Sequence, residues 1–193
     1  MKIVSFFDMG SGIELFDTVN NSIRNCKFAN LTMFGVQMQG FQMDNNEISY
    51  CDFIDNFVFD IPYYPTGALV IECYRSQGIK INHCNFSNNH HPVVLYIARF
   101  VQITDNNIAN NFDNEGVEII GFSFLNLRKN WWGNPQGPKI ILNRPFSENP
   151  LIIRDIKGSD TVIFNGWKAF FTGISHIYPW RTEPVSDAGQ HLN

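Results

Sequence analysis

The fold of this chain is decided by the stretch Leu127-Arg128-Lys129-Asn130-Trp131-Trp132-Gly133-Asn134-Pro135-Gln136-Gly137-Pro138. Degenerate repeats precede this stretch, whereas the sequence after it does not repeat, and six of the nine prolines lie beyond Gly133. We therefore predict that the stretch contains the last turn of a coil of repeats and the beginning of the segment that caps it.

One pattern recurs before this stretch: an aliphatic residue, two residues of any type, Cys or Asn, one further residue and a bulky apolar residue. Its first positions lie 25, 33, 22 and 24 residues apart, which is close to one β-helix turn apart from a long insertion between Phe53 and Ile81. The five copies are Ile23-Cys26-Phe28, Ile48-Cys51-Phe53, Ile81-Cys84-Phe86, Ile103-Asn106-Ile108 and Leu127-Asn130-Trp132.

A second short segment precedes each copy, with apolar outer members and a mostly polar middle residue. This alternation is typical of a strand with one buried face, and no stretch shows sustained helical periodicity. Each repeat is therefore expected to hold two or three short strands, in five turns at about 12–30, 35–53, 67–86, 92–108 and 116–132. The segments are Ile13-Glu14-Leu15, Val36-Gln37-Met38, Ile71-Glu72-Cys73, Val93-Val94-Leu95 and Val117-Glu118-Ile119.

Three of the four cysteines, Cys26, Cys51 and Cys84, share one repeat position, and no Cys-x-x-Cys pair is present. This indicates buried thiols that act as small apolar side chains, in one inward column that continues as Asn106 and Asn130. The alternative is a sandwich of antiparallel strands. Stacked equivalent turns require matching residues at matching positions, and a sandwich does not.

These repeats resemble those of right-handed parallel β-helix proteins, the pectate-lyase-like superfamily, and are closest to its carbohydrate-binding and sugar-hydrolase group. Asn130-Trp131-Trp132-Gly133-Asn134-Pro135-Gln136-Gly137-Pro138 resembles the signature that closes many such coils, and Tyr178-Pro179-Trp180-Arg181-Thr182-Glu183-Pro184 resembles the ending of bacterial and archaeal members. The likeness covers roughly residues 12–184. It implies an all-β fold, a right-handed single-stranded parallel β-helix of about five turns with a C-terminal β cap. The group includes lyases, hydrolases, adhesins and scaffolds, so the resemblance implies no single activity.

We expect three segments along the chain: β-helix turns over residues 1–132, cap strands over residues 133–185 and a mobile polar tail over residues 186–193. Residues 1–11 read as the tail of an earlier turn, so upstream turns of the same chain are expected. The cap strands, Lys139-Ile140-Ile141-Leu142, Leu151-Ile152-Ile153 and Thr161-Val162-Ile163-Phe164, are expected to fold over the open end of the coil.

Composition limits the partners. The net charge of −4 argues against nucleic acid, and no apolar run reaches the roughly 18 residues that a membrane span needs. No nucleotide or phosphate fingerprint is present, and we expect no cofactor. We also expect no metal site, because His83 and Cys84 are neighbours in a strand and point to opposite faces.

Stacked turns bring equivalent corners together, which predicts one candidate site at the edge of the coil. Tyr63 and Tyr64 lie in the insertion at residues 55–66, His90 and His91 follow the third copy, and Asp113 and Glu115 follow the fourth. The tyrosines and histidines suit a sugar, with a histidine as a base and Asp113 or Glu115 as an acid. The alternative is that all of these are solvated turn residues.

A second candidate is the outward row of the leading strands, predicted as Glu14, Gln37, Glu72, Val94 and Glu118. In this row Glu72 and Glu118 lie two turns apart, about 9–10 Å at the usual strand spacing. Carboxylates of inverting glycosidases are separated by roughly 6.5–9.5 Å, which makes the two glutamates candidate catalytic residues. The alternative is one solvent-facing carboxylate per turn, which keeps a sheet soluble.

The leading hypothesis from sequence is an extracellular or cell-envelope module that binds polysaccharide, in a protein that is secreted, periplasmic or at the cell surface. The first alternative is the C-terminal part of a polysaccharide lyase or glycoside hydrolase. The second is a structural stalk or adhesin segment.

Overall fold

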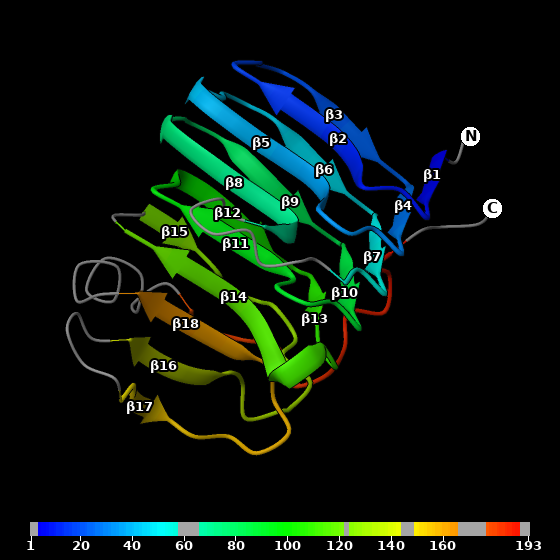
Figure 1. Cartoon of the computed structure of the whole chain (residues 1–193). Helices are drawn as coiled ribbons and strands as arrows, with labels where there is room; N and C mark the ends of the chain where they lie inside the picture. The colour runs from blue at the N-terminus through cyan, green and yellow to red at the C-terminus, as the bar shows by residue number, and fades with distance from the viewer. Residues whose placement is uncertain (1–3, 58–65, 122–123, 144–148, 166–176, 190–193) are drawn as a thin grey trace.

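The computed structural model describes residues 4–57, 66–121, 124–143, 149–165 and 177–189, and these residues form a parallel β-helix of three sheets (Figure 1). The three sheets are named A, B and C, and each full turn contributes one strand to sheet B, then one to sheet C and then one to sheet A. The described part of the chain has no helix long and apolar enough to cross a membrane.

The strands of sheet A are β1 (Val4–Phe7), β4 (Cys26–Ala29), β7 (Asp52–Ile54), β10 (Asn85–Ser87) and β13 (Asn107–Ile108). The strands of sheet C are β3 (Ser22–Arg24), β6 (Glu47–Ser49), β9 (Ile79–Asn82), β12 (Arg99–Thr104) and β15 (Phe124–Asn126). Sheet B holds β2 (Ser11–Phe16), β5 (Phe34–Gln42), β8 (Gly67–Arg75), β11 (Val93–Tyr96), β14 (Glu115–Ile120), β18 (Thr161–Asn165), β16 (Lys139–Asn143) and β17 (Leu151–Arg154), in that spatial order. A 3₁₀ turn, η1 (Phe112–Asn114), precedes β14.

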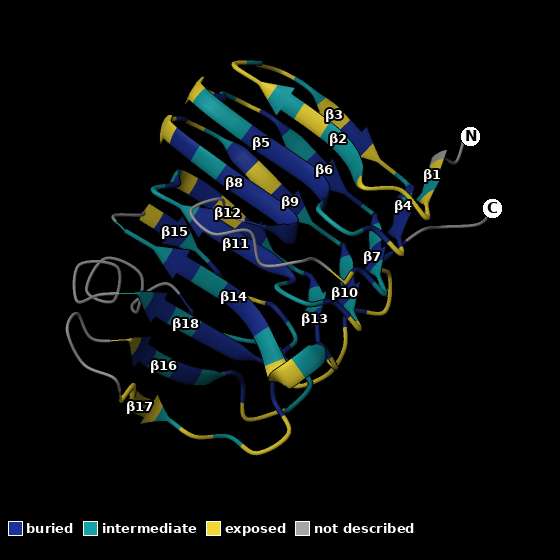
Figure 2. Ribbon diagram, viewed as in Figure 1, coloured by how far each residue is buried: buried dark blue, intermediate teal, exposed yellow. Residues whose placement is uncertain are grey.

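The repeat pattern sets the register, because each copy stacks on the next with like residues in contact. In sheet C, Ile23 pairs with Ile48, which pairs with Ile81 in the next turn. In sheet A, the rings of Phe28 and Phe53 stack at 4.9 Å, one step of a buried aromatic column. These columns fill the narrow interior between the sheets. Figure 2 shows the buried residues of the strands in dark blue. The predicted five-turn coil is confirmed.

The column of thiols and amides also runs inside the coil, as predicted. The Cys26 amide donates to the Cys51 sulfur at 3.5 Å, and the Cys84 amide donates to the Asn106 side-chain oxygen at 2.8 Å. The backbone amide of Asn106 donates in turn to the side-chain oxygen of Asn130 at 3.0 Å. The contact between Cys26 and Cys51, together with burial, raises the pKa of the Cys26 thiol, so this thiol stays protonated and unreactive.

A second amide column, at the corner between sheets A and B, was not predicted as such. Asn56 donates to the Asn89 oxygen at 2.8 Å, and Asn89 donates to the Asn111 oxygen at 3.1 Å. Asn111 donates to the Asp160 carboxyl group at 2.5 Å, which ends the column. All four side chains are buried, so each amide satisfies polar groups that the coil removes from water.

The C-terminal strands differ from the prediction that they fold over the end of the coil. β18 pairs in parallel with β14, β16 pairs in parallel with β18, and β17 pairs antiparallel with β16 at the edge of the sheet. Val162 and Phe164 of β18 align with Val117 and Ile119 of β14. Because their apolar alternation matches the inward rows of the coil, β18 and β16 continue sheet B as further rungs.

The two motifs quoted for the chain end contact each other. The indole nitrogen of Trp180 donates to the Pro135 carbonyl at 3.2 Å, and the Arg154 guanidinium lies 4.2 Å from the centre of the Trp180 ring. Gly137 has a left-handed backbone at φ +86°, and a Cβ at this position would overlap the Trp180 ring. Glycine is therefore required here by both its conformation and the packed ring.

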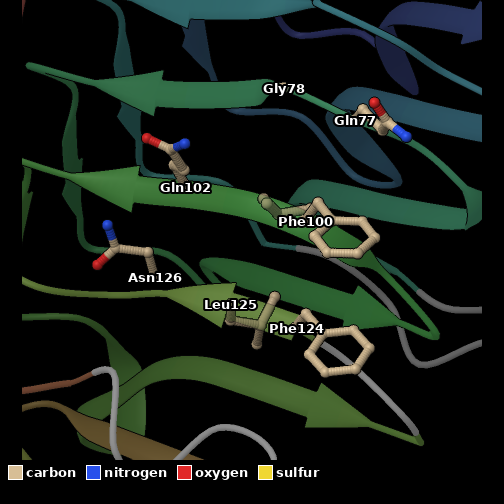
Figure 3. A pocket seen from close by; sticks show the side chains of 8 residues that line it. Gln77, Gly78, Phe100, Gln102, Phe124, Leu125 and Asn126 are labelled. Carbon is tan, nitrogen blue, oxygen red and sulfur yellow. The ribbon is translucent and has the colours of Figure 1, made fainter.

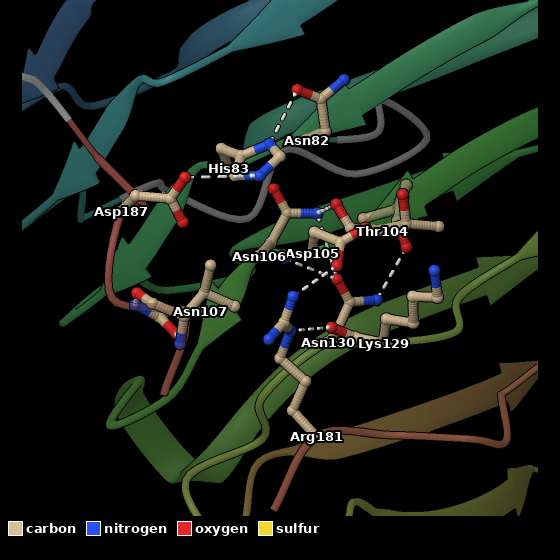
Figure 4. A network of polar contacts seen from close by, with 12 residues as sticks. Asn82, His83, Thr104, Asp105, Asn106, Asn107, Lys129, Asn130, Arg181 and Asp187 are labelled. Atoms are coloured by element: carbon tan, nitrogen blue, oxygen red, sulfur yellow. Dashed lines mark hydrogen bonds and ion pairs between the residues drawn. The ribbon is translucent and has the colours of Figure 1, made fainter. Parts of the chain in front are cut away.

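Residues 177–189, named here the C-terminal strap, cross the end of the coil and run back along it (Figures 1 and 4). The Lys129 amide donates to the Pro179 carbonyl at 2.6 Å, and the Arg181 amide donates to the Asn130 carbonyl at 3.0 Å. The Arg181 guanidinium donates to the Lys129 carbonyl at 3.1 Å and to Asp105 at 2.7 Å. The strap therefore joins the last two turns.

Residues 186–189 of the predicted tail belong to this strap and contact the coil. Asn107 and Val185 exchange two hydrogen bonds of 2.7 and 3.1 Å. Farther along, the Gly189 amide donates to the His83 carbonyl at 2.8 Å, and the His83 ring lies 3.6 Å from Asp187. Polar composition alone did not reveal that the coil offers these partners.

Candidate functional site

The predicted edge between sheets A and B brings two of the candidate residues into contact. His91 lies two residues before the start of β11, and Glu115 begins β14, one turn later. The Nδ1 atom of His91 lies 2.9 Å from the Glu115 carboxylate, and the His91 amide donates to the same oxygen at 3.3 Å. Stacking of equivalent corners, 24 residues apart, produces this pair as the sequence analysis expected.

The pair has a defined electrostatic character. Burial alone raises the pKa of Glu115, but the hydrogen bonds and charge of His91 outweigh it, so the pKa is lowered overall. A carboxylate that stays ionised suits an ion-pair partner better than the acid role predicted for Glu115.

The remaining edge candidates are arranged differently. The His90 ring packs edge-on against Phe112 at 5.2 Å and lies 6.0 Å from the His91 ring. Asp113 is exposed within η1 and lines a hollow of about 380 Å³ together with Glu115 and Asp155. Tyr63 and Tyr64 lie outside the described residues.

The predicted outward row is wrong at one position. Gln37 pairs with Val70, and Val70 pairs with Val94, which pairs with Glu118. Glu72 instead aligns with Tyr96 in the neighbouring row, so Glu72 and Glu118 are separated along the strand as well as by two turns. β8 is displaced by two residues from the predicted alignment, and a two-residue shift keeps every side chain on its predicted face.

Each glutamate has its own surroundings. Burial raises the pKa of Glu72. Glu118 accepts a hydrogen bond from the side chain of Asn165 on β18, and Asn143 on β16 donates to the Asn165 oxygen at 2.7 Å. The two carboxyl groups lie in different rows, so they are not aligned as the predicted catalytic pair requires.

A small hollow connects the edge pair with Glu118. It is lined by His91, Glu115, Glu118 and Asn143 among others and measures about 160 Å³. Sites for drug-sized ligands measure about 300–1,000 Å³. This edge hollow is therefore too small for an oligosaccharide. Across the described ranges, no three His, Cys, Asp or Glu side chains are arranged to hold a metal ion.

A larger groove lies on the outer face of sheet C, where the sequence analysis placed no candidate (Figure 3). Its cavity volume is about 610 Å³, and it crosses the third, fourth and fifth turns. Phe100 and Phe124 lie side by side in it, with ring centres 5.3 Å apart and planes 11° from parallel. Both rings are exposed, at 53% and 42%. The other lining residues are Gln77, Gly78, Val101, Gln102, Leu125 and Asn126.

A sequence signal for this groove exists. The position three residues before the first member of each repeat copy is a turn former in the first three copies and phenylalanine in the last two. An exposed aromatic at a turn position serves neither the turn nor the core, so the change marks a surface with another role. The five residues are Asn20, Asn45, Gly78, Phe100 and Phe124.

Comparison with known proteins places the chain by family. A family model described as a right-handed β-helix region matches residues 2–143. Neither the curated proteins nor the solved structures contain a match. The matched region includes all five turns and β16, and the three stacked sheets have the parallel pairing that such a fold requires. The chain therefore belongs to the right-handed β-helix family.

Proposed function

We propose that this chain is a polysaccharide-binding β-helix module that acts outside the cytoplasm, in the cell envelope or after secretion. The observation that carries the proposal is the groove on sheet C. Its volume of about 610 Å³ lies within the range of ligand sites, and it combines two exposed aromatic rings with three amide side chains.

The chemistry of the groove fits a sugar. Pyranose rings have apolar C–H faces that pack on aromatic side chains, and their hydroxyl groups exchange hydrogen bonds with amides. Phe100 and Phe124 supply the first kind of contact, and Gln102 and Asn126 supply the second from adjacent strands. The groove crosses several turns, which suits a chain of sugars rather than a single one.

Binding is favoured over turnover. No carboxylate, imidazole or thiol is among the described residues that line the groove, so it holds no acid or base for glycosidic cleavage. The edge hollow holds such groups in only about 160 Å³. The hollow of about 380 Å³ lined by Asp113, Glu115 and Asp155 holds carboxylates, but its described lining has no aromatic ring on which a sugar could pack. A purely structural stalk has no need of exposed phenylalanines at turn positions.

Affinity electrophoresis against a broad panel of soluble polysaccharides tests the proposal. We expect at least one polysaccharide to retard the wild-type protein and the double variant Phe124→Ala, Gln102→Ala to lose this retardation. Phe16→Asn removes an equally exposed ring from β2 on sheet B and serves as the control that keeps binding. Retardation by no member of the panel, or equal retardation of the double variant, would contradict the proposal.

The enzymatic alternative has its own test. Incubation with the same panel is expected to release neither reducing sugar nor unsaturated uronate. Release that disappears in Glu118→Gln would overturn the binding assignment in favour of a hydrolase or lyase. Fractionation of producing cells checks the proposed location, which a purely cytoplasmic pool would contradict.

A further inference from the structure

Phe100 has a backbone conformation that its residue type disfavours. The equivalent corner residues of the earlier turns are Asn20, Asn45 and Gly78, with φ values of 60°, 53° and 77°. Phe100 follows them at φ 54°. Asparagine and glycine enter the left-handed region readily, whereas a bulky side chain enters it at a cost. The fourth turn therefore places a phenylalanine where the stack favours a turn former.

A β-bulge accompanies this conformation. Arg99 pairs with Phe124 and Val101 pairs with Leu125, so Phe100 is the extra residue of β12. Bulges redirect side chains, and this one directs the Phe100 ring to the outer surface beside Phe124. Strained residues persist where surrounding structure maintains them, and they cluster at functional sites.

The groove is also uncharged. Its described lining contains the amides Gln77, Gln102 and Asn126 and no Lys, Arg, Asp or Glu. Charged side chains, Arg75 and Arg99 with Asp44, line the adjoining hollow of about 370 Å³. A groove that selects a uronate or a sulfate would be expected to place a guanidinium or ammonium group within it.

The spacing of the lining residues indicates the orientation of a bound sugar chain. Gln102 and Asn126 are register partners on successive rungs, which are about 4.8 Å apart in a sheet. This rise is comparable to the length of one pyranose unit in an extended chain. Repeated contacts along the coil axis therefore match repeated sugar units.

We infer that the groove takes an uncharged polysaccharide lying along the axis of the coil, and that Phe100 determines this specificity. The inference rests on the proposed polysaccharide-binding function and adds the substrate class, the orientation and the residue. Aromatic contact supplies the affinity, the amides bind hydroxyl groups, and the described lining offers no cation to an acidic chain.

Matched polysaccharides test the substrate class. Hydroxyethylcellulose and carboxymethylcellulose share a backbone and differ in charge, as do dextran and dextran sulfate. We expect a neutral member of a pair to retard the protein. Its affinity should be the same at low and high salt, because only binding between exposed charges depends on salt. The acidic member should retard the protein less.

Two variants test Phe100 itself. Phe100→Asn should weaken binding at least about tenfold and raise Tm by about 2–4 °C, because asparagine accepts the left-handed backbone. Phe124→Asn removes the neighbouring ring from a residue outside the left-handed region, so it should weaken binding without raising Tm. Phe16→Asn should change neither binding nor selectivity.

The outcomes separate the inference from the function on which it rests. Stronger, salt-sensitive binding of the acidic members that Phe100→Asn weakens would keep the polysaccharide-binding function and overturn the neutral substrate class. Unchanged affinity in Phe100→Asn would overturn the role of Phe100. Binding of no polysaccharide, matched or otherwise, would overturn both the function and the inference.

Discussion

At the scale of single residues, this coil depends on side chains that tolerate a left-handed backbone at its corners. One column of such residues follows sheet C, and another follows sheet A and consists of asparagine and aspartate. These residues hydrogen-bond locally and enter this region more readily than others. The paired asparagines Asn88-Asn89 and Asn110-Asn111 therefore mark corners. The column after sheet C consists of Asn25, Tyr50, His83, Asp105 and Lys129, and the column after sheet A consists of Asn30, Asp55, Asn88 and Asn110.

Asp160 gives a prediction about pH at this scale. Burial raises its pKa to about 7, although two hydrogen bonds from Asn111 act in the opposite direction. An unfolded aspartate has a pKa of about 3.9. Between about pH 4 and pH 7 the folded state therefore binds more protons than the unfolded state, and the free energy of unfolding falls as the pH rises through this window.

Asp160→Asn should remove this fall, because an amide oxygen can accept the hydrogen bonds of Asn111 without ionising. We expect thermal unfolding at a series of pH values to show a smaller decrease of Tm between pH 4 and pH 7 in the variant than in the wild type. Asp155→Asn, at an exposed aspartate of the same connecting segment, is the control. Parallel Tm curves for the wild type and Asp160→Asn would refute the assignment.

At the scale of elements, the sequence predicted strand identity better than strand alignment. The copies that contain Ile48, Ile81 and Ile103 align in sheet C as predicted, because Cys or Asn at one fixed position marks the register of each copy. β8 follows the insertion and has apolar residues at nearly every position, so alternation alone did not separate Leu69 from Ile71 as the partner of Val36. The row that joined Glu72 to Glu118 failed for this reason.

The C-terminal strap gives a prediction at the same scale. Arg181→Ala removes the ion pair with Asp105 and the hydrogen bond to the Lys129 carbonyl. We expect the free energy of unfolding to fall by about 1–2 kcal/mol, since two charge-assisted contacts are lost at a partly exposed site. Urea unfolding measures this change.

Arg128→Ala is the matched control, because Arg128 is exposed on the same final turn and has no side-chain contact of this kind among the described residues. Its free energy of unfolding should stay within about 0.5 kcal/mol of the wild-type value. An equal effect of the two arginine variants would show that the strap does not stabilise the coil.

At the scale of the whole molecule, the repeats predicted the fold but not the groove on sheet C. Matching residues at matching positions predicted the coil and its interior column from sequence alone, and they predicted one shared edge for a set of residues that includes His91 and Glu115. The groove on sheet C required more, because it combines side chains of three turns with a bulge at Phe100. Sequence patterns record which face a residue takes, and they do not record local irregularity of this kind.

A backbone amide NMR titration with a soluble oligosaccharide of the best-binding polysaccharide tests most directly whether a sugar chain binds on sheet C. We expect chemical-shift changes that concentrate at residues 77–78, 100–102 and 124–126 and saturate with oligosaccharide concentration. Shifts that concentrate instead at His91, Glu115 and Glu118, or no saturable shifts at all, would contradict binding on sheet C.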